Sequence, residues 1–192
     1  MPPVPAVSGF TYPIAGACLP DSDDLIPNAP RPYRYGVHEG IDFYDGAACV
    51  AIGEGTPVLA AKDGVIVRAD WAFVEMTPEE LDQLLTRSQS QGYTDAQALD
   101  RFRGRQVWID HGGGVVTRYA HLGGIAPGVD VGTAVRAGQV VGYVGNSGTP
   151  EAVTAPTTEM HLHFEIWVSG SYLGAGLPAD QVRALLGQAF SP

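Results

Sequence analysis

The sequence predicts a mainly β fold in which a twisted antiparallel sheet carries a small helical insertion and a short C-terminal helix. Its 25 Gly and 15 Pro are spread among short Val- and Ile-rich runs, a pattern typical of short strands joined by tight turns. At 192 residues, 45% of them hydrophobic, the chain is long enough for one well-buried domain and short for two. No repeat of fixed period is visible, so solenoids and propellers are not expected.

Residues 1–36 are expected to form an extended N-terminal arm and residues 37–192 a single domain. The arm is rich in proline and has no periodicity. Cys18 in the arm and Cys49 in the domain belong to no C-x-x-C pair, so a disulfide and two buried thiols both stay open. The start, MPPVPAVSGF, lacks the basic and then apolar pattern of a signal peptide, so the protein is either cytoplasmic or has lost a leader.

Two β-hairpins are predicted in the domain. TPVLA and VIVRA flank a KDG turn, and QVWID and VVTRYAHL flank HGGG, whose His111 we interpret as a structural turn residue. Two further short strands are expected around a turn at residues 136–139. Near the end, PADQVRALLG predicts the short terminal helix.

Between the two hairpins, residues 71–104 have the apolar spacing of helices and are interpreted as an insertion. We expect a helical hairpin over residues 77–103, because capping boxes with Thr77 and Thr94 as N-caps open its two segments and SQSQG lies between them as the turn. Each segment carries an apolar stripe, formed by Leu81, Leu84 and Leu85 in the first and by Ala98, Leu99 and Phe102 in the second. Short helices need a surface to cover such stripes, so we expect the hairpin to pack on the sheet or its rim and to border a groove.

The stretch EMHLHFEIW, residues 159–167, holds two of the five histidines. Side chains alternate along a strand, so His161, His163 and Glu165 are expected on one face and the apolar residues between them on the other. The apolar row predicts a core face. The polar row differs from the Thr, Lys or Ser of an ordinary solvated face and predicts a site.

VHEGID, residues 37–42, offers an imidazole and a carboxylate that are both common zinc ligands. In a straight strand His38 and Asp42 would lie roughly 13 Å apart, so the backbone must bend, and we expect the kink at Gly40. Combined with the two histidines of HLHFE, this pair completes a zinc site with three protein ligands and an open position. One histidine remains for acid-base work near neutral pH.

The motifs VHEGID, YAHL, VRAGQVVGYVGNSG and HLHFE, in this order, resemble the lysostaphin-type, or LytM-like, zinc metalloendopeptidases. The resemblance covers about residues 35–168 and implies a twisted antiparallel sheet that forms a groove. It also implies one Zn²⁺ per chain, a pair of catalytic histidines and a metal-activated water. The metal ligands it implies are His38, Asp42 and His163, and the catalytic pair is His121 and His161. Glu165 is either an acceptor that steadies a metal-bound histidine or a solvated carboxylate.

The same resemblance implies that the substrate is peptidoglycan, cut in its stem or crossbridge peptides, and that the protein is secreted or held in the cell envelope. An activating partner in the envelope stays open. The segment PEAVTAPTTEM is longer than the link usual in such enzymes, and the insertion at 71–104 is not typical of them. Both departures concern the choice of substrate rather than the chemistry.

Parts of the sequence also match three other functions. A non-catalytic binding or regulatory module on the same fold is the main alternative, although such modules typically lack metal ligands. A biotin or lipoyl carrier is suggested by Lys62 in PVLAAKDGVIV, but carriers are shorter and need no H-x-H. HGGG alone does not make a serine hydrolase, because no G-x-S-x-G is present. The net charge of −10 argues against nucleic acid and anionic membranes as partners, and no apolar run reaches membrane-spanning length.

Overall fold

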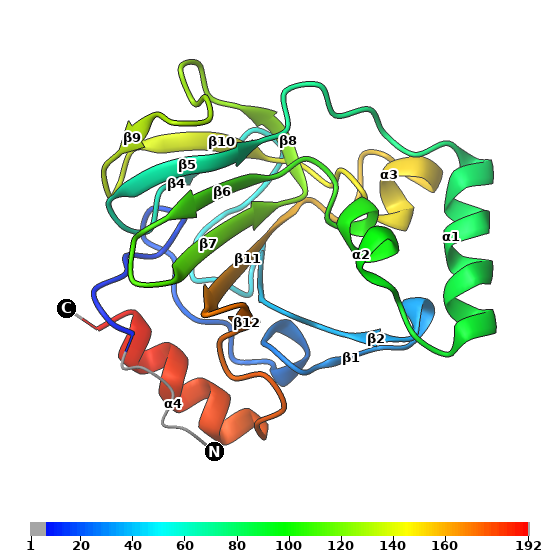
Figure 1. Cartoon of the computed structure of the whole chain (residues 1–192), viewed down its shortest axis with the longest axis horizontal. Helices are drawn as coiled ribbons and strands as arrows, with labels where there is room; N and C mark the ends of the chain where they lie inside the picture. The colour runs from blue at the N-terminus through cyan, green and yellow to red at the C-terminus, as the bar shows by residue number, and fades with distance from the viewer. Residues whose placement is uncertain (1–6, 192) are drawn as a thin grey trace.

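The computed structural model describes residues 7–191, so the first six residues of the predicted arm lie outside it (Figure 1). Its main sheet has seven strands and is antiparallel throughout, which confirms the mainly β prediction. The order along the sheet is β12-β11-β7-β6-β5-β9, and β3 also pairs with β11. The strands are β3 (Ile41–Tyr44), β5 (Gly64–Ala69), β6 (Val107–Asp110), β7 (Val115–Ala120), β9 (Ala134–Val135), β11 (His161–Val168) and β12 (Ser171–Tyr172).

A second sheet of three strands has the order β4-β10-β8, and its strands are β4 (Pro57–Leu59), β8 (Leu122–Ile125) and β10 (Val140–Val144). The prediction that TPVLA and VIVRA form a hairpin is therefore wrong. TPVLA contains β4, which pairs with β10, and VIVRA lies in β5, which pairs with β6 and β9. The chain crosses between the sheets at Ala60 and Ala61, which are fully buried. The Ala60 amide donates to the Gln139 carbonyl, and the Ala61 amide donates to the Tyr119 hydroxyl. Neither amide is therefore available to pair with VIVRA in a hairpin.

The second predicted hairpin is confirmed, because β6 and β7 pair with Val107 opposite Tyr119. His111 in its turn has the structural role expected of it. Its Nδ1 lies 2.8 Å from the Asp63 carbonyl and its Nε2 lies 2.8 Å from the Thr117 hydroxyl. The two short strands around residues 136–139 also exist, although β9 joins the main sheet and β10 the second sheet.

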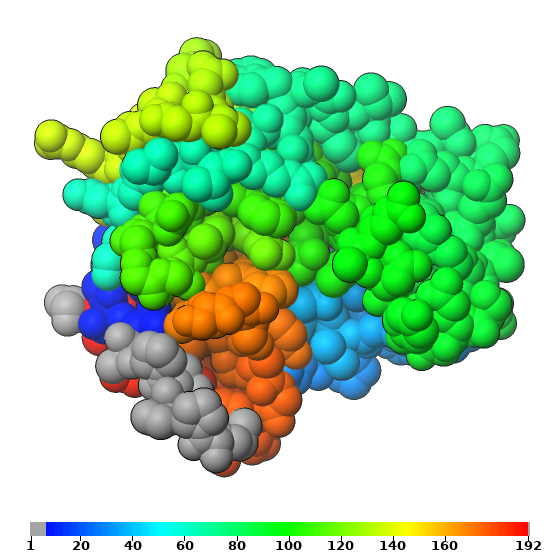
Figure 2. All heavy atoms as spheres, in the orientation of Figure 1, coloured from blue at the N-terminus to red at the C-terminus, as the bar shows by residue number. Residues whose placement is uncertain are grey.

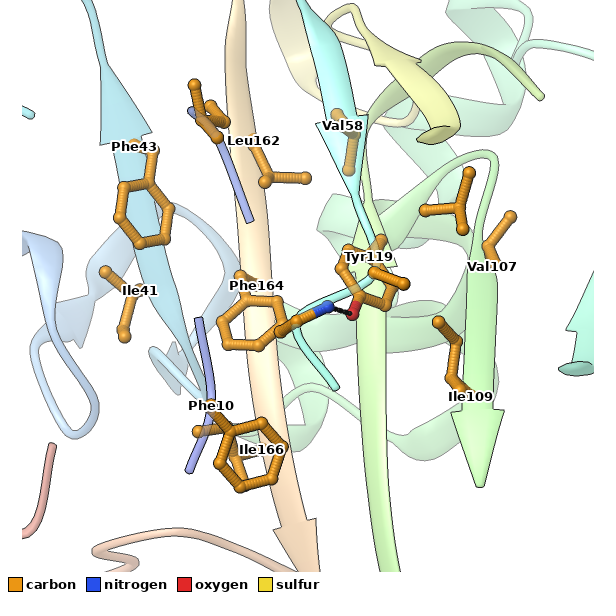
Figure 3. Packing of buried hydrophobic residues seen from close by; sticks show 14 of the residues in the cluster. Phe10, Ile41, Phe43, Val58, Val107, Ile109, Tyr119, Leu162, Phe164 and Ile166 are labelled. Carbon is orange, nitrogen blue, oxygen red and sulfur yellow. Dashed lines mark hydrogen bonds between the residues drawn. The ribbon is translucent and has the colours of Figure 1, made fainter. Parts of the chain in front are cut away.

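The apolar face of β11 forms the middle of the core, as the alternation of HLHFE predicts. Leu162 and Phe164 are completely buried among residues of the neighbouring strands, including Phe43 and Tyr119 (Figure 3). The C-terminal helix α4 (Ala179–Ala189) is confirmed and packs onto this core. The core thus fixes the position of β11, and with it the opposite, polar face of that strand.

The described part of the arm packs into the same core. Phe10, Ile14 and Ile26 are buried there, and a disulfide joins Cys18 to Cys49 with 5.6 Å between their Cα atoms. The arm contains the short elements η1 (Asp23–Leu25), β1 (Pro30–Arg31), η2 (Pro32–Arg34) and β2 (Gly36–Val37). On its path from the core to β3, the arm brings Arg31 of β1 to within 3.0 Å of Asp42 and lets residues of η2 line the same pocket as His161 and His163.

The insertion forms the predicted helical hairpin, α1 (Pro78–Gln91) and α2 (Ala96–Arg103), seen in green at one end of the molecule (Figure 2). Thr77 caps α1 as expected, but Asp95 rather than Thr94 caps α2, because the Thr94 hydroxyl bonds the Arg34 carbonyl instead. The predicted SQSQG turn is also wrong, since α1 continues to Gln91 and ends at Gly92, whose φ is 74°.

The apolar stripes of the hairpin do not pack on the sheet, contrary to expectation. Apart from Leu99, their residues pack on each other and on Val153 of α3 (Pro150–Thr154), and so form a second, smaller core. This core consists of Met76, Leu81, Leu84, Ala98 and Phe102. None of the helices in residues 7–191 is long and apolar enough to span a membrane.

Candidate metal centre

Strand pairing brings the predicted site residues together from distant parts of the chain. β11 lies between β3 and β7, with His163 opposite Asp42 on one side and opposite Ala120 on the other. His121 directly follows Ala120 at the end of β7. The polar face of β11 therefore meets the His38–Asp42 segment along one edge and His121 along the other.

The predicted bend between His38 and Asp42 is present, and it brings His38 Nε2 to 2.9 Å from Asp42 Oδ1. The reason for glycine at position 40 differs from the one expected, because its backbone is not in the left-handed region. A Cβ on Gly40 would lie 2.4 Å from the carbonyl oxygen of Phe164 and 3.0 Å from Cε1 of His163. Glycine is required here because the chain passes directly against β11.

Three donor atoms converge at the bend: His38 Nε2, Asp42 Oδ1 and His163 Nδ1. They lie 2.8 to 3.0 Å from one another, and all three residues are buried. Potential ligand atoms of this trio lie within 4.8 Å of each other. Two imidazole nitrogens and one carboxylate oxygen form a donor set that suits zinc, so the chemistry of the residues present fits this metal.

Further contacts determine which nitrogen of each ring faces the trio. His38 Nδ1 lies 3.0 Å from the Ile26 carbonyl, which can only accept, so Nδ1 carries the proton and leaves Nε2 free. His163 is turned the other way, with Nε2 2.8 Å from Glu165 Oε1 and Nδ1 in the trio. Glu165 is completely buried, which contradicts the alternative of a solvated carboxylate. A carboxylate bound to the far nitrogen of a ligand histidine is the usual second layer of metal sites.

His121 and His161 lie beside the trio, and their ring centroids are 4.7 Å apart. Each turns Nδ1 to a backbone carbonyl, at 2.8 Å to Ser147 and 2.7 Å to Glu159, and thereby keeps Nε2 free. His121 occupies the left-handed region with a φ of 58°, a conformation unusual for a residue with a Cβ. This backbone turn directs its ring away from the strand direction of β7 and toward the other histidines.

Burial and the neighbouring carboxylates together set the charge of the four histidines at the site. Burial lowers the pKa of His38 to about 4 despite the neighbouring Asp42, and it lowers the pKa values of His121 and His161 as well. Burial also disfavours the cation of His163, but hydrogen bonds to the two carboxylates that flank it outweigh burial and raise its pKa to about 9. At neutral pH, three imidazoles are therefore neutral and His163 is an imidazolium between two carboxylates.

The five predicted site residues line one pocket of about 540 Å³; they are His38, Asp42, His121, His161 and His163. Its walls come from segments far apart in the sequence: Leu25 from the arm, Leu85 and Leu99 from the α1–α2 hairpin, and Glu151 from α3. The hairpin thus borders the pocket, as expected. The long segment PEAVTAPTTEM, which contains α3, also contributes to the wall.

Reasoning from the sequence missed several pocket residues, and three of these, Tyr44, Arg31 and Arg103, contact a predicted site residue or Glu165. Tyr44 stacks on His161 with 4.2 Å between the ring centroids, and Arg31 Nη2 lies 3.0 Å from Asp42 Oδ2. Tyr44 was detectable, because it shares a strand face with Asp42. Arg31 and Arg103, which also lines the pocket, carry no motif that could have identified them.

Comparisons with known proteins identify the family of the chain. The family model described as Peptidase family M23 matches residues 36–175. The chain is 32% identical over 146 residues to the peptidoglycan DD-endopeptidase ShyA of Vibrio cholerae, covering 76% of this chain and 24% of that protein. It is 30% identical over 141 residues to the DD-carboxypeptidase/endopeptidase Mpg of Neisseria meningitidis, covering 73% of this chain and 22% of that protein. The chain therefore spans less than a quarter of the length of these curated relatives.

Among solved structures, a zinc-containing peptidase from Vibrio cholerae superposes with a TM-score of 0.52 at 23% identity, covering 90% of this chain and 41% of that chain. At this level of identity the likeness concerns the fold alone. It agrees with the antiparallel sheet described above.

Proposed function

The chain belongs to peptidase family M23, and on that premise we propose that it is a zinc-dependent endopeptidase that hydrolyses peptide bonds of bacterial cell-wall peptidoglycan. The observation that carries the proposal is the convergence of two imidazoles and one carboxylate, with two further histidines beside them, on the floor of one pocket. A metal-binding trio alone would also fit a structural site. The two additional histidines with free Nε2 atoms favour a hydrolytic one.

In this proposal His38, Asp42 and His163 hold one zinc ion per chain. When bound, the ion would polarise the scissile carbonyl and lower the pKa of a coordinated water toward about 7. Glu165 orients the His163 ring and keeps Nδ1 directed at the site. The proposed catalytic unit is the domain of residues 37–192, which contains nearly all of the family match.

His121 and His161 are the proposed catalytic pair. Because burial lowers their pKa values, both are neutral at working pH and can accept a proton at Nε2. A protonated ring can then stabilise the developing oxyanion by a hydrogen bond or deliver the proton to the leaving amine. Their Nδ1 bonds to backbone carbonyls hold both rings in the orientation that these transfers need.

Peptidoglycan is proposed as the substrate because the relatives ShyA and Mpg are named as a peptidoglycan DD-endopeptidase and a DD-carboxypeptidase/endopeptidase. This substrate implies a secreted or envelope location. The Cys18–Cys49 disulfide supports that location, since disulfides persist mainly in oxidising compartments. A non-catalytic module on the same fold is less well supported, because all five expected site residues are present and adjacent.

The test is to incubate the purified, zinc-loaded protein with cell walls of differing crossbridge chemistry and to identify the released peptide termini by mass spectrometry. We expect new termini at one peptide bond of the stem or crossbridge, and none with His163→Ala. Zinc bound at one ion per chain without any released termini would overturn the enzymatic proposal in favour of the binding module.

A further inference from the structure

The last residue of the inserted hairpin, Arg103, is built into the candidate metal centre. It ends α2 and lines the pocket, and its side chain is only 7% exposed. Its Nε donates to Glu165 Oε1 at 2.6 Å. The same Oε1 lies 2.8 Å from Nε2 of His163. One carboxylate oxygen therefore links the inserted helix to the histidine that turns its other nitrogen to the trio.

Arg103 is the closest cation to this carboxylate. Glu165 has no exposed surface, so its charge must be balanced inside the protein. The other arginine near it, Arg118, is 3.5 Å from Oε2 and stacks between Trp108 and Trp167. Arg118 and the indole Nε1 of Trp167 thus face the second oxygen, whereas Arg103 holds the oxygen that bonds His163.

The backbone of Arg103 makes a second connection to the site. Its carbonyl accepts a hydrogen bond of 2.9 Å from the amide of His121. This amide belongs to the residue with a φ of 58°, whose backbone conformation needs support from its surroundings. Arg103 therefore contacts both the ligand side and the catalytic side of the pocket.

We infer that Arg103 is a positioning residue that acts through Glu165 to hold the His163 ring in its metal-binding orientation, which makes the inserted hairpin part of the site rather than an addition to it. The inference rests on the proposed zinc site. It assigns Arg103 no contact with substrate. A guanidinium suits this place because its Nε–H is fixed in the plane of the group and gives the carboxylate one defined direction.

The first test measures zinc affinity by calorimetry for the full chain and its variants. We expect Arg103→Met to weaken zinc binding about 10- to 100-fold, the usual effect of removing an outer-layer partner. Arg103→Lys, which keeps the charge but lacks the planar donor, should weaken zinc binding less than Arg103→Met does. If Arg103 acts through Glu165, the double variant Arg103→Met/Glu165→Gln should bind zinc no more weakly than Glu165→Gln alone.

Arg101→Met is the matched control. Arg101 lies in the same helix, and its guanidinium pairs with Glu80 at 2.7 Å on the partly exposed side, away from the pocket. Its loss should leave zinc affinity unchanged. The double variant also guards against misfolding, because it removes the buried carboxylate charge that Arg103→Met alone would leave without its nearest cation.

A second measurement uses the metal-free protein, in which ¹⁵N signals of the imidazoles report the His163–Glu165 hydrogen bond directly. Arg103→Met should shift or broaden the His163 signals and leave those of His111 unchanged. The inference would be overturned if Arg103→Met kept wild-type zinc affinity and left the His163 signals unchanged. It would also be overturned if the losses of zinc affinity in Arg103→Met and Glu165→Gln simply added in the double variant. If the wild-type protein itself binds no zinc, the proposed function fails, while the His163 signals still test the role of Arg103.

Discussion

Gly40→Ala is the sharpest single test of how the site is assembled. The added Cβ would lie 2.4 Å from the Phe164 carbonyl oxygen, 2.9 Å from Cγ of Glu165 and 3.0 Å from Cε1 of His163. The nearest of these atoms belongs to the backbone of β11, which cannot rotate away. The segment carrying His38 and Asp42 must therefore move away from β11, and the three donor atoms must separate.

The expected losses of folding stability and of zinc affinity follow from this contact. Overpacking typically destabilises by about 1–3 kcal/mol, and we expect the upper end because a backbone oxygen cannot move aside as a flexible side chain can. Zinc affinity should fall at least tenfold, or about 1.4 kcal/mol. Urea denaturation measures the first quantity and calorimetric zinc titration the second.

Gly53→Ala provides the matched control, since a Cβ at Gly53 meets no atom within 4 Å and its backbone is outside the left-handed region. Its free energy of unfolding should stay the same or rise by up to about 1 kcal/mol. If Gly40→Ala keeps both the unfolding midpoint and the zinc affinity of the wild type, the argument that close approach to β11 dictates glycine here is refuted.

Four further predictions concern catalysis, protons, the disulfide and the hairpin. His121→Ala and His161→Ala should keep zinc but lose roughly 10²-fold or more in wall hydrolysis, and loss of metal together with activity would make that residue a ligand. Because the pKa of His163 is raised to about 9 in the metal-free protein, zinc must displace its proton; affinity measured by calorimetry should therefore rise with pH from about 6.5 to 9, and a flat profile would contradict this. Cys18→Ser/Cys49→Ser should lower the free energy of unfolding by about 3–4 kcal/mol in urea denaturation, given the separation of 31 residues, and an unchanged midpoint would count against the bond. Leu85→Ala and Leu99→Ala, which alter the pocket wall, should change cleavage of whole walls more than cleavage of a short soluble peptide, and equal changes on both would argue against control of access by the hairpin.

Local periodicity was enough to predict the parts of the site that lie on regular elements. Alternation in HLHFE places His161, His163 and Glu165 on one face whatever the rest of the fold does. The bend at Gly40 also followed from the sequence, because two ligands four residues apart cannot meet in a straight strand. In both cases the signal lies within a few consecutive residues.

The features that were missed depend on contacts between distant segments. Thr94 and Asp95 are adjacent and both capable N-caps, and the choice between them is made by a bond from Thr94 to the Arg34 carbonyl, 60 residues away. The partner of β4 is similarly decided by the crossing of the chain between two sheets. Arg103 meets Glu165 across 62 residues with no motif at either position that indicates the pair. Propensity and pattern carry no information at that range.

The polar face of β11 is itself an argument for function. β11 is paired on both sides, and His161, His163 and Glu165 are all buried there. Apolar residues of similar size would stabilise such a position better, because buried ionisable groups lose their hydration and must be compensated by partners. The chain supplies a partner for each of them from a different place in the sequence: Asp42 of β3 for His163, the Glu159 carbonyl for His161, and Arg103 of the insertion for Glu165. A strand face maintained for stability alone would not contain such destabilising groups. A site maintained for its chemistry requires them, and it requires a partner for each.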